Sequence, residues 1–210
     1  LADGTPRLMP GLLAEVDGGI CYVDEVNLLD DHLVDLVLDA AASGLVRVER
    51  EGLSASRRAA FSLVGTMNPE EGALRPQLLD RFGLCVDVRG ETDPAARVEV
   101  IRRRLAYEDD PVAFAAAWRE AGDELAARID RAIGLLPEVR AGDDVLGRVA
   151  SICIEAGVDG HRADIMMVRA ARALAAWDGR ARVGADDLDR AGRLVLPHRM
   201  RRRPLEGIGS

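Results

Sequence analysis

One stretch of sequence decides the fold of this chain: Ile20-Cys21-Tyr22-Val23-Asp24-Glu25. An apolar run that ends in two acids is typical of a strand buried in a parallel sheet. The carboxyl end of such a strand is where α/β proteins bind their ligands. We therefore expect Asp24 and Glu25 at the functional edge of a sheet. An ordinary strand that ends in solvated acids is the alternative interpretation.

The residues that follow predict the rest of an α/β layer. Residues 31–43 predict a helix that ends at Gly44. Residues 45–57 predict a hairpin with its turn at 51–52, and residues 61–66 a second buried strand. A short helix over 76–82 and a third strand over 84–88 complete the layer. The apolar face of the first helix is expected to consist of Leu33, Leu36, Val37 and Ala40.

After Gly90 the pattern becomes helical. Asp93 and Pro94 start a helix, and further helices are expected over residues 111–135, 143–157, 161–178 and 185–196. An apolar stripe is predicted on the helix over residues 161–178, formed by Ile165, Val168, Ala171, Leu174 and Trp177. We expect an α/β part over residues 1–90, a helical domain over 91–200, and a tail or linker over 201–210.

Composition narrows the class of protein. The net charge is −8, so a nucleic-acid partner is not expected. All 28 basic residues are arginine, and lysine is absent. No apolar run is long enough to span a membrane. Cys21, Cys85 and Cys153 are far apart and form no metal-binding pair, which favours free thiols in the cytoplasm. The histidines, His32, His161 and His198, lack metal-ligand spacing as well.

A second functional signal lies at residues 65–69, Gly-Thr-Met-Asn-Pro, where an apolar strand ends in Asn68. A side-chain amide at the same sheet edge can hydrogen-bond a γ-phosphate or an attacking water without adding charge. A plain Asn-Pro turn is the alternative.

Two arginines follow along the chain. Arg81 ends the short helix and is expected to project outward, where it could reach a neighbouring subunit's γ-phosphate; an arginine bonded to its own helix end is the alternative. Arg162 begins a helix of the helical domain and could contact phosphates when that domain closes; a solvated arginine in the first turn is the alternative.

The order of these signals is that of an AAA+ ATPase from its Walker B motif onward. Asp24 would hold Mg²⁺ and Glu25 would polarise the attacking water. Asn68 would act as sensor 1, Arg81 as an arginine finger and Arg162 as sensor 2. The predicted fold is therefore a partial AAA+ P-loop NTPase core of the α/β class followed by an all-helical lid.

Longer stretches resemble the ATPase (I) subunit of magnesium chelatase. They are YVDEVNLL at 22–29, VEREG at 48–52, NPEEG at 68–72, LRPQLLDRFG at 74–83, RVEVIRRRL at 97–105, VDGHR at 158–162, AARALAA at 170–176 and PHR at 197–199. The resemblance implies a homo-hexameric ring that hydrolyses ATP with Mg²⁺. Its partners would be a D-type subunit with an integrin-like domain and a large porphyrin-binding catalytic subunit. Magnesium would enter protoporphyrin IX; cobaltochelatases, which insert cobalt into a corrin precursor, share this architecture. The hairpin at 45–57 would face the ring's pore or a partner, or merely cover the sheet.

The chain departs from that family in two places. The phosphate-binding GxxxxGK[ST] loop is absent from these residues, so they are expected to bind ATP weakly and to hydrolyse none by themselves. The first residue is Leu1, so the true N-terminus is expected upstream. His161 also stands where a small apolar residue is usual. Three other interpretations remain: a MoxR-like remodelling ATPase, a non-catalytic ring scaffold, and part of a fusion of I-type and D-type subunits.

Overall fold

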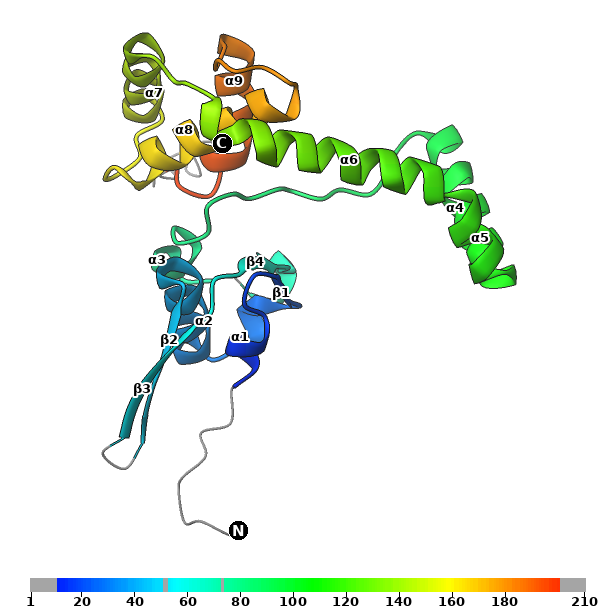
Figure 1. Cartoon of the computed structure of the whole chain (residues 1–210), viewed down its shortest axis with the longest axis horizontal. Coiled ribbons are helices and arrows are strands. Elements are labelled where there is room, and N and C mark those ends of the chain that lie inside the picture. The colour runs from blue at the N-terminus through cyan, green and yellow to red at the C-terminus, as the bar shows by residue number, and fades with distance from the viewer. Residues whose placement is uncertain (1–10, 51–52, 73, 201–210) are drawn as a thin grey trace, which may run out of the picture. The chain divides into compact units, whose positions relative to one another are not determined.

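The computed structural model describes residues 11–50, 53–72 and 74–200 (Figure 1). It divides the chain into two compact units, Leu1–Phe82 and Gly83–Ser210, whereas the sequence pattern placed the change of character near Gly90. The predicted tail over 201–210 lies outside the described residues.

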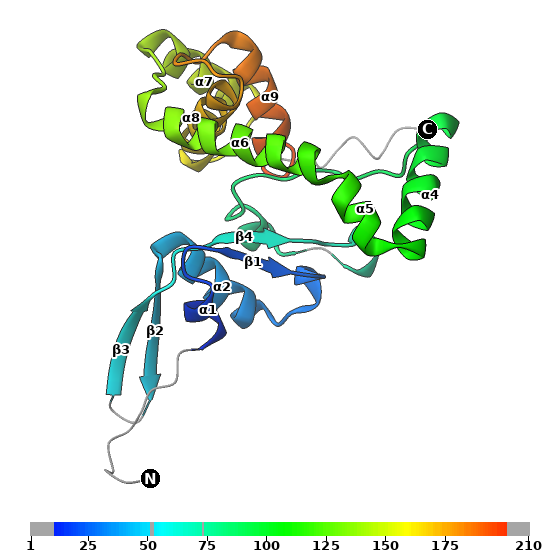
Figure 2. The ribbon, with the colours of Figure 1, turned by 45° about the vertical axis from the view of Figure 1, so that its right-hand side comes forward.

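The first unit is built on a pair of parallel strands. β1 (Ile20–Val23) and β4 (Ser62–Gly65) lie side by side, with Ile20 opposite Ser62 and Val23 opposite Gly65 (Figure 2). The chain between them contains α2 (Asp31–Ser43) and the antiparallel hairpin of β2 (Leu45–Arg50) and β3 (Leu53–Arg58). Gly44 ends α2 with a φ of 70°, the left-handed conformation that glycine adopts without strain. The smaller elements are α1 (Leu12–Glu15), the 3₁₀ turns η1 (Val26–Leu28) and η2 (Pro69–Glu71), and α3 (Pro76–Leu79).

The core of this unit lies between α2 and one face of the strand pair. Its buried members are Val26, Val34, Leu38, Leu74 and Leu78. The predicted face of α2 is wrong in part, because Leu33 and Leu36 are exposed and Val34 and Leu38 take their place. Val34 and Leu38 are four residues apart and so lie on the same side of the helix, which the packing of η1 and α3 selects.

The two strands are not buried on both faces, contrary to expectation. Ile20 and Tyr22 are 68% and 61% exposed, and Val64 on β4 is exposed as well. Their alternate residues, Cys21 and Leu63, face inward. The uniformly apolar sequence predicts two covered faces, but the described residues supply a covering layer for only one.

The third predicted strand is also wrong. Residues 84–88 are extended but pair with no strand in the described part of the chain, and Val86 and Val88 are exposed. The segment is anchored to its own unit by the Cys85 amide, which donates to the Leu194 carbonyl at 2.8 Å. Apolar alternation alone does not make a strand where a ladder of backbone partners is missing.

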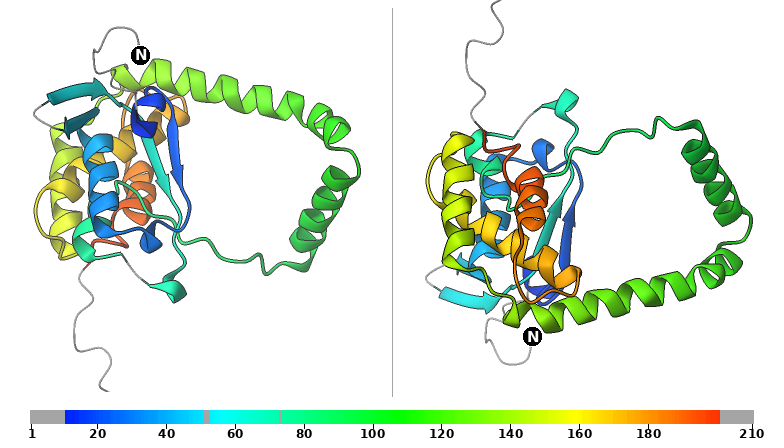
Figure 3. Two further views of the ribbon diagram at one scale, coloured as in Figure 1. Left: turned by 90° about the horizontal axis from the view of Figure 1, so that it is seen from below. Right: turned by 90° about the horizontal axis from the view of Figure 1, so that it is seen from above.

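The second unit is mainly helical from Pro94 onward, as the sequence predicts, but the single helix expected over residues 111–135 is divided into two helices at Trp118. α6 (Arg119–Leu135) runs from the α4 and α5 end of the unit into the bundle formed by α7, α8 and α9 (Figure 3). Asp93 caps α4 by accepting hydrogen bonds from the amides of Ala95 and Ala96. The remaining elements are α4 (Pro94–Asp109), α5 (Pro111–Ala117), η3 (Leu136–Glu138), α7 (Asp143–Glu155), α8 (Arg162–Trp177) and α9 (Ala185–Val195).

The core of the second unit is centred on α8. Its largest fully buried side chains include Met167, Leu188 and Val149. The predicted stripe on α8 is displaced by about half a turn at its start, since Ile165 is exposed while Ala163 and Met167 are buried. The small alanines of α8 are what allow α9 to pack closely against it.

All three cysteines are free thiols. Cys153 is buried in this core, and burial raises the pKa of its thiol to about 11. Among the described residues, no helix has the length and apolar character needed to cross a bilayer.

A buried ion pair fixes the start of α9. Asp187 has no solvent exposure and accepts hydrogen bonds from both terminal nitrogens of Arg180, at 2.7 and 2.6 Å, and from the Gly184 amide at 2.8 Å. The Arg180 hydrogen bonds hold the pKa of Asp187 below its ordinary value. This carboxylate therefore ties the preceding loop to the helix in its charged form.

We predict that Asp187→Ala lowers the free energy of unfolding of this unit by about 2–4 kcal/mol, because Arg180 loses its buried partner. Urea unfolding followed by circular dichroism measures the change. In the unsubstituted protein, the stabilisation is present above the unfolded-state pKa of about 3.9 and is lost as the pH falls through the lower folded-state value. Asp186→Ala, at the exposed neighbouring position, is the control; equal losses in the two variants would contradict the assignment.

Candidate functional site

The carboxylate of Asp24 lies at the carboxyl end of β1, as predicted, and is held there by two hydroxyl groups. Thr66 donates to Asp24 Oδ1 at 2.5 Å and Tyr22 donates to the same oxygen at 3.0 Å. These hydrogen bonds, that of Thr66 above all, hold the pKa of Asp24 below its usual range. The parallel register explains the contact, because Val23 faces Gly65 and the next residues on the two strands are Asp24 and Thr66.

Glu25 occupies an unusual backbone conformation. Its φ of 50° and ψ of 49° make it the one non-glycine residue with a positive φ in the described part of the chain. The Glu25 amide donates to the Thr66 hydroxyl at 3.0 Å, and the Val26 amide donates to the Thr66 carbonyl at 2.9 Å. A left-handed glutamate costs about 1–2 kcal/mol, and such residues persist where their surroundings hold them, often at functional sites.

Asn68 follows β4 at the same edge and begins η2. Its side-chain oxygen accepts a hydrogen bond from the Glu70 amide at 3.1 Å, which is the turn-forming role expected of an Asn-Pro pair. This contact uses the oxygen, so the amide NH₂ is the part of the side chain suited to donate to a phosphate or a water. The Asn-Pro turn, which was the alternative interpretation, and the predicted ligand contact are therefore compatible.

Asn27 holds the loop over residues 68–72 in place through two hydrogen bonds. Its amide NH₂ donates to the Gly72 carbonyl at 3.1 Å and to the Asn68 carbonyl at 3.5 Å. The Asn27 side-chain oxygen is buried and accepts no hydrogen bond from the described residues. Asn27 thus connects the turn after β1 to the loop after β4.

Arg81 does not project outward as expected. Its Nη1 atom lies 2.6 Å from Asp35 Oδ1, and its Nη2 atom pairs with Asp39 on the same helix, α2. The side chain is 22% exposed. The reason is a contact between residues distant in sequence, because Asp35 and Asp39 lie four residues apart on α2 and match the two ends of the guanidinium fork.

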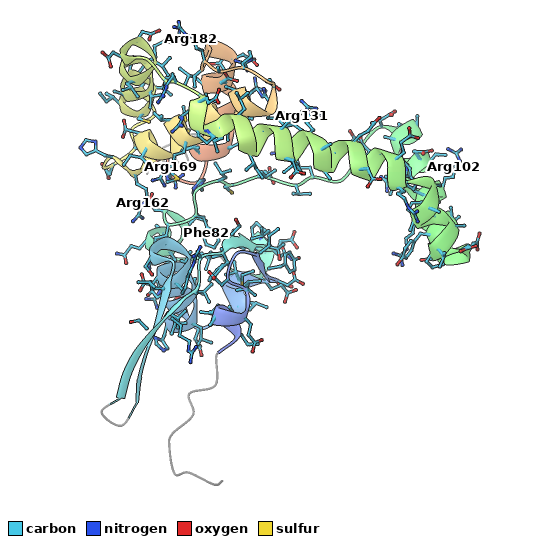
Figure 4. All side chains as sticks on the ribbon, in the orientation of Figure 1. Phe82, Arg102, Arg131, Arg162, Arg169 and Arg182 are labelled. Carbon is cyan, nitrogen blue, oxygen red and sulfur yellow. The ribbon has the colours of Figure 1, made fainter. Side chains whose placement is uncertain are left out.

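Arg162 lies in the second unit, where it begins α8 with an exposed side chain (Figure 4). The neighbouring His161 is almost fully exposed, and its Nδ1 atom lies 3.9 Å from the Asp164 carboxylate. The structure brings Asp24, Glu25 and Asn68 to one sheet edge; Arg81 bonds elsewhere in the same unit.

The donor set at this edge fits Mg²⁺ bound together with a phosphate ligand. No cluster of three or more histidines, cysteines or acids that could hold a metal occurs in the part of the chain that the structure describes. Mg²⁺ characteristically binds one or two protein carboxylates and completes its shell with water and phosphate oxygens. Asp24, whose charged form is stabilised by two hydroxyls, has the chemistry that such a ligand requires.

Sequence reasoning missed two residues of this site, Thr66 and Asn27. Thr66 is the second residue of the Gly-Thr-Met-Asn-Pro stretch, and the signal for it was its position as the polar last residue of the strand predicted over 61–66. Asn27 was recognisable as a polar residue between the acids and an apolar pair. Neither signal specifies a hydrogen-bond partner some 40 residues away.

Comparison with known proteins first defines the class. The AAA lid domain family matches residues 147–208. The structure of a candidate ATPase from Cytophaga hutchinsonii superposes with a TM-score of 0.62, at 18% sequence identity, over 86% of this chain and 58% of that chain. The fold is therefore that of an AAA+ ATPase, with part of the α/β core followed by the helical lid.

The particular relatives are magnesium-chelatase subunits. The ChlI homolog of Methanocaldococcus jannaschii is 52% identical over 98% of this chain, and ChlI of Synechocystis is 49% identical over all of it. An uncharacterized protein of Mycobacterium tuberculosis is 55% identical over the whole chain. The chain covers 56%, 59% and 33% of these proteins, respectively. The chain is thus similar to chelatase I subunits over at least 98% of its own length and over little more than half of theirs, and this similarity confirms the resemblance found in the sequence.

We predict that Thr66→Val raises the pKa of Asp24 toward its ordinary value, because the charged carboxylate loses its closest donor. An NMR titration of the Asp24 carboxyl carbon measures the shift. Thr66→Ser keeps the hydroxyl and is the control, with an expected pKa close to that of the unsubstituted chain. A Thr66→Val variant that also titrates like the unsubstituted chain would contradict the role of this hydrogen bond.

Proposed function

We propose that these residues form the part, from Walker B to lid, of an ATP-hydrolysing motor subunit that drives the insertion of magnesium into protoporphyrin IX. The observation that carries the proposal is the group formed by Thr66, Asp24 and Glu25 at the edge of the parallel strands. It presents one carboxylate in ionised form and fixes the backbone of the next acid. The identity of about 50% to ChlI subunits supports the chelatase assignment.

Each residue has a distinct role in this proposal. Asp24 holds Mg²⁺, and the ion when bound neutralises charge on the β- and γ-phosphates. Glu25 accepts a hydrogen bond from the attacking water and orients it. The Asn68 amide donates to the γ-phosphate or to that water. Arg162, a residue of the helical lid, contacts the phosphates of the bound nucleotide.

The proposed protein works as a homo-hexameric ring. The nucleotide of one subunit lies next to Arg81 of another, and that arginine stabilises charge in the transition state. The phosphate-binding loop that this proposal requires is not among residues 1–210, which contain no lysine. The partners that the resemblance implies are the D-type subunit and the large porphyrin-binding subunit, on which metal insertion itself takes place.

Chelation assays separate this function from its alternatives. With the D-type and porphyrin-binding subunits present, the full-length protein is expected to support ATP-dependent formation of magnesium protoporphyrin. If the ATPase activity of the full-length protein does not change when porphyrin and those subunits are added, the MoxR-like alternative is favoured. Insertion of cobalt into a corrin precursor in the same format would favour the cobaltochelatase alternative.

We predict that Glu25→Gln in the full-length protein preserves ATP binding and lowers turnover at least a hundredfold, because the water loses its polarising base. Nucleotide binding by calorimetry and phosphate release are the two measurements. Glu15→Gln, an exposed change in the same unit, serves as the control with normal turnover. Normal turnover in Glu25→Gln itself would remove Glu25 from the catalytic role.

We predict that Arg81→Ala acts across the subunit boundary. In rings mixed with unsubstituted subunits, activity is expected to fall below the value calculated for independent subunits, because each altered arginine disables its neighbour's site. Arg75→Ala is the control, since Arg75 immediately precedes α3, whereas Arg81 follows it, and Arg75 pairs with Asp31 of α2 instead. Activity that falls only in proportion to the altered subunits would contradict a finger role.

A further inference from the structure

Arg81 is bound by two carboxylates of its own subunit, and this arrangement has a consequence for the proposed ring. We propose that Asp35 and Asp39 form a latch that withholds the Arg81 guanidinium from a neighbour's nucleotide, so that the acid pair limits the rate of ATP hydrolysis. The inference rests on the proposed role of Arg81 as an arginine finger. Asp35 and Asp39 are positioning residues, since they act through Arg81.

The latch is specific in its geometry. The two carboxylates lie one helical turn apart on α2, and each takes one end of the guanidinium, with 2.6 Å between Arg81 Nη1 and Asp35 Oδ1. A planar fork with fixed donor directions suits this two-point contact. The Arg81 backbone is fixed as well, because its amide donates to the Leu78 carbonyl at 3.0 Å. Only the side chain has to move for the arginine to be released.

The exposure of the three side chains shows that Arg81 is withheld rather than presented. The Arg81 side chain is 22% exposed, whereas the side chain of Arg75, at the other end of α3, is 73% exposed. The carboxylates are more open, at 52% for Asp35 and 73% for Asp39. They also line an open groove of about 650 Å³ that runs along α2 to the start of β2. Opening the latch therefore breaks two solvent-accessible ion pairs and leaves the core intact.

The charges favour a switch that a nucleotide can open. Two carboxylates face one guanidinium, so the closed latch keeps a net negative charge and does not itself attract a phosphate. A γ-phosphate bound with Mg²⁺ offers Arg81 more acceptor oxygens and a less solvated site than either acid. Exposed ion pairs are weak, so two of them shift the equilibrium between held and released arginine by roughly three- to tenfold. This size is large enough to limit turnover and small enough for the nucleotide to overcome.

The chain contains a matched control for the latch. Asp31, also on α2, pairs with Arg75, and this ion pair joins the same two parts of the unit without involving Arg81. Asp31→Asn therefore removes the same kind of charge and the same kind of surface contact. Any effect of charge on folding or ring assembly is shared by the control, whereas an effect on Arg81 is not.

The test uses the full-length protein assembled into rings, with ATPase activity measured at saturating ATP. Asp35→Asn with Asp39→Asn is expected to raise kcat about three- to tenfold with little change in KM, because Arg81 acts on the transition state. Asp39→Asn alone is expected to give a smaller increase, and Asp31→Asn none. In an Arg81→Ala background, the double substitution is expected to change nothing further.

The outcomes separate the latch from the function on which it rests. A kcat that is unchanged or lower in both the double variant and Asp39→Asn, while Arg81→Ala still reduces turnover, overturns the latch and leaves the finger role intact. An increase that persists in the Arg81→Ala background also overturns the latch, since the effect then bypasses the arginine. If Arg81→Ala has no effect on turnover in intact rings, the finger role fails and the latch fails with it. Thermal unfolding of each variant verifies that the rings compared are folded.

Discussion

The hydroxyl group of Thr66 is the contact on which the candidate site depends. It donates to the Asp24 carboxylate and accepts from the Glu25 amide, so one side chain orders both acids. It can do so because the parallel pairing of β1 with β4 brings Thr66 beside Asp24. The same contact keeps Glu25 in a left-handed conformation and directs the chain into η1, from which Asn27 reaches the loop of Asn68. Strand register, backbone strain and site geometry are thus one arrangement.

The chain uses the same ion-pair chemistry at two very different strengths. Asp187 is fully buried and takes both ends of Arg180, so the pair is a permanent part of the helical unit. Asp35 and Asp39 share Arg81 while exposed to solvent, where such contacts are readily exchanged. Burial of the carboxylate, rather than the identity of the residues, separates the structural ion pair from the adjustable one, because Asp187 has no exposure and Asp35 and Asp39 are more than half exposed. An adjustable pair is what a residue with a partner in another subunit requires.

The sequence was sufficient for the order of the elements from β1 to α3, for most of the helices after Gly90, and for the two acids and Asn68 at the sheet edge. Periodicity and caps located the helices, and the acids after residues 20–23 located Asp24 and Glu25. What failed depended on neighbours distant in sequence. The buried side of α2 is chosen by η1 and α3, which favour Val34 over Leu33, and residues 84–88 have no strand to pair with. Likewise, the direction of Arg81 follows from acids more than 40 residues earlier, and no local pattern encodes that contact.

The parallel pairing of β1 and β4 also bears on how the chain folds. Thr66 and Asp24 are 42 residues apart, and a parallel pair cannot form through a tight turn, so its formation requires closing a long loop that contains α2 and the hairpin. The helices α8 and α9 are consecutive and joined by a short loop, and chains with such local contacts fold fastest. The helical unit is therefore expected to be complete while the sheet edge is still open. The two acids of the sheet edge, Asp24 and Glu25, are therefore expected to reach their final positions late, through the same long-range closure that brings Thr66 to them.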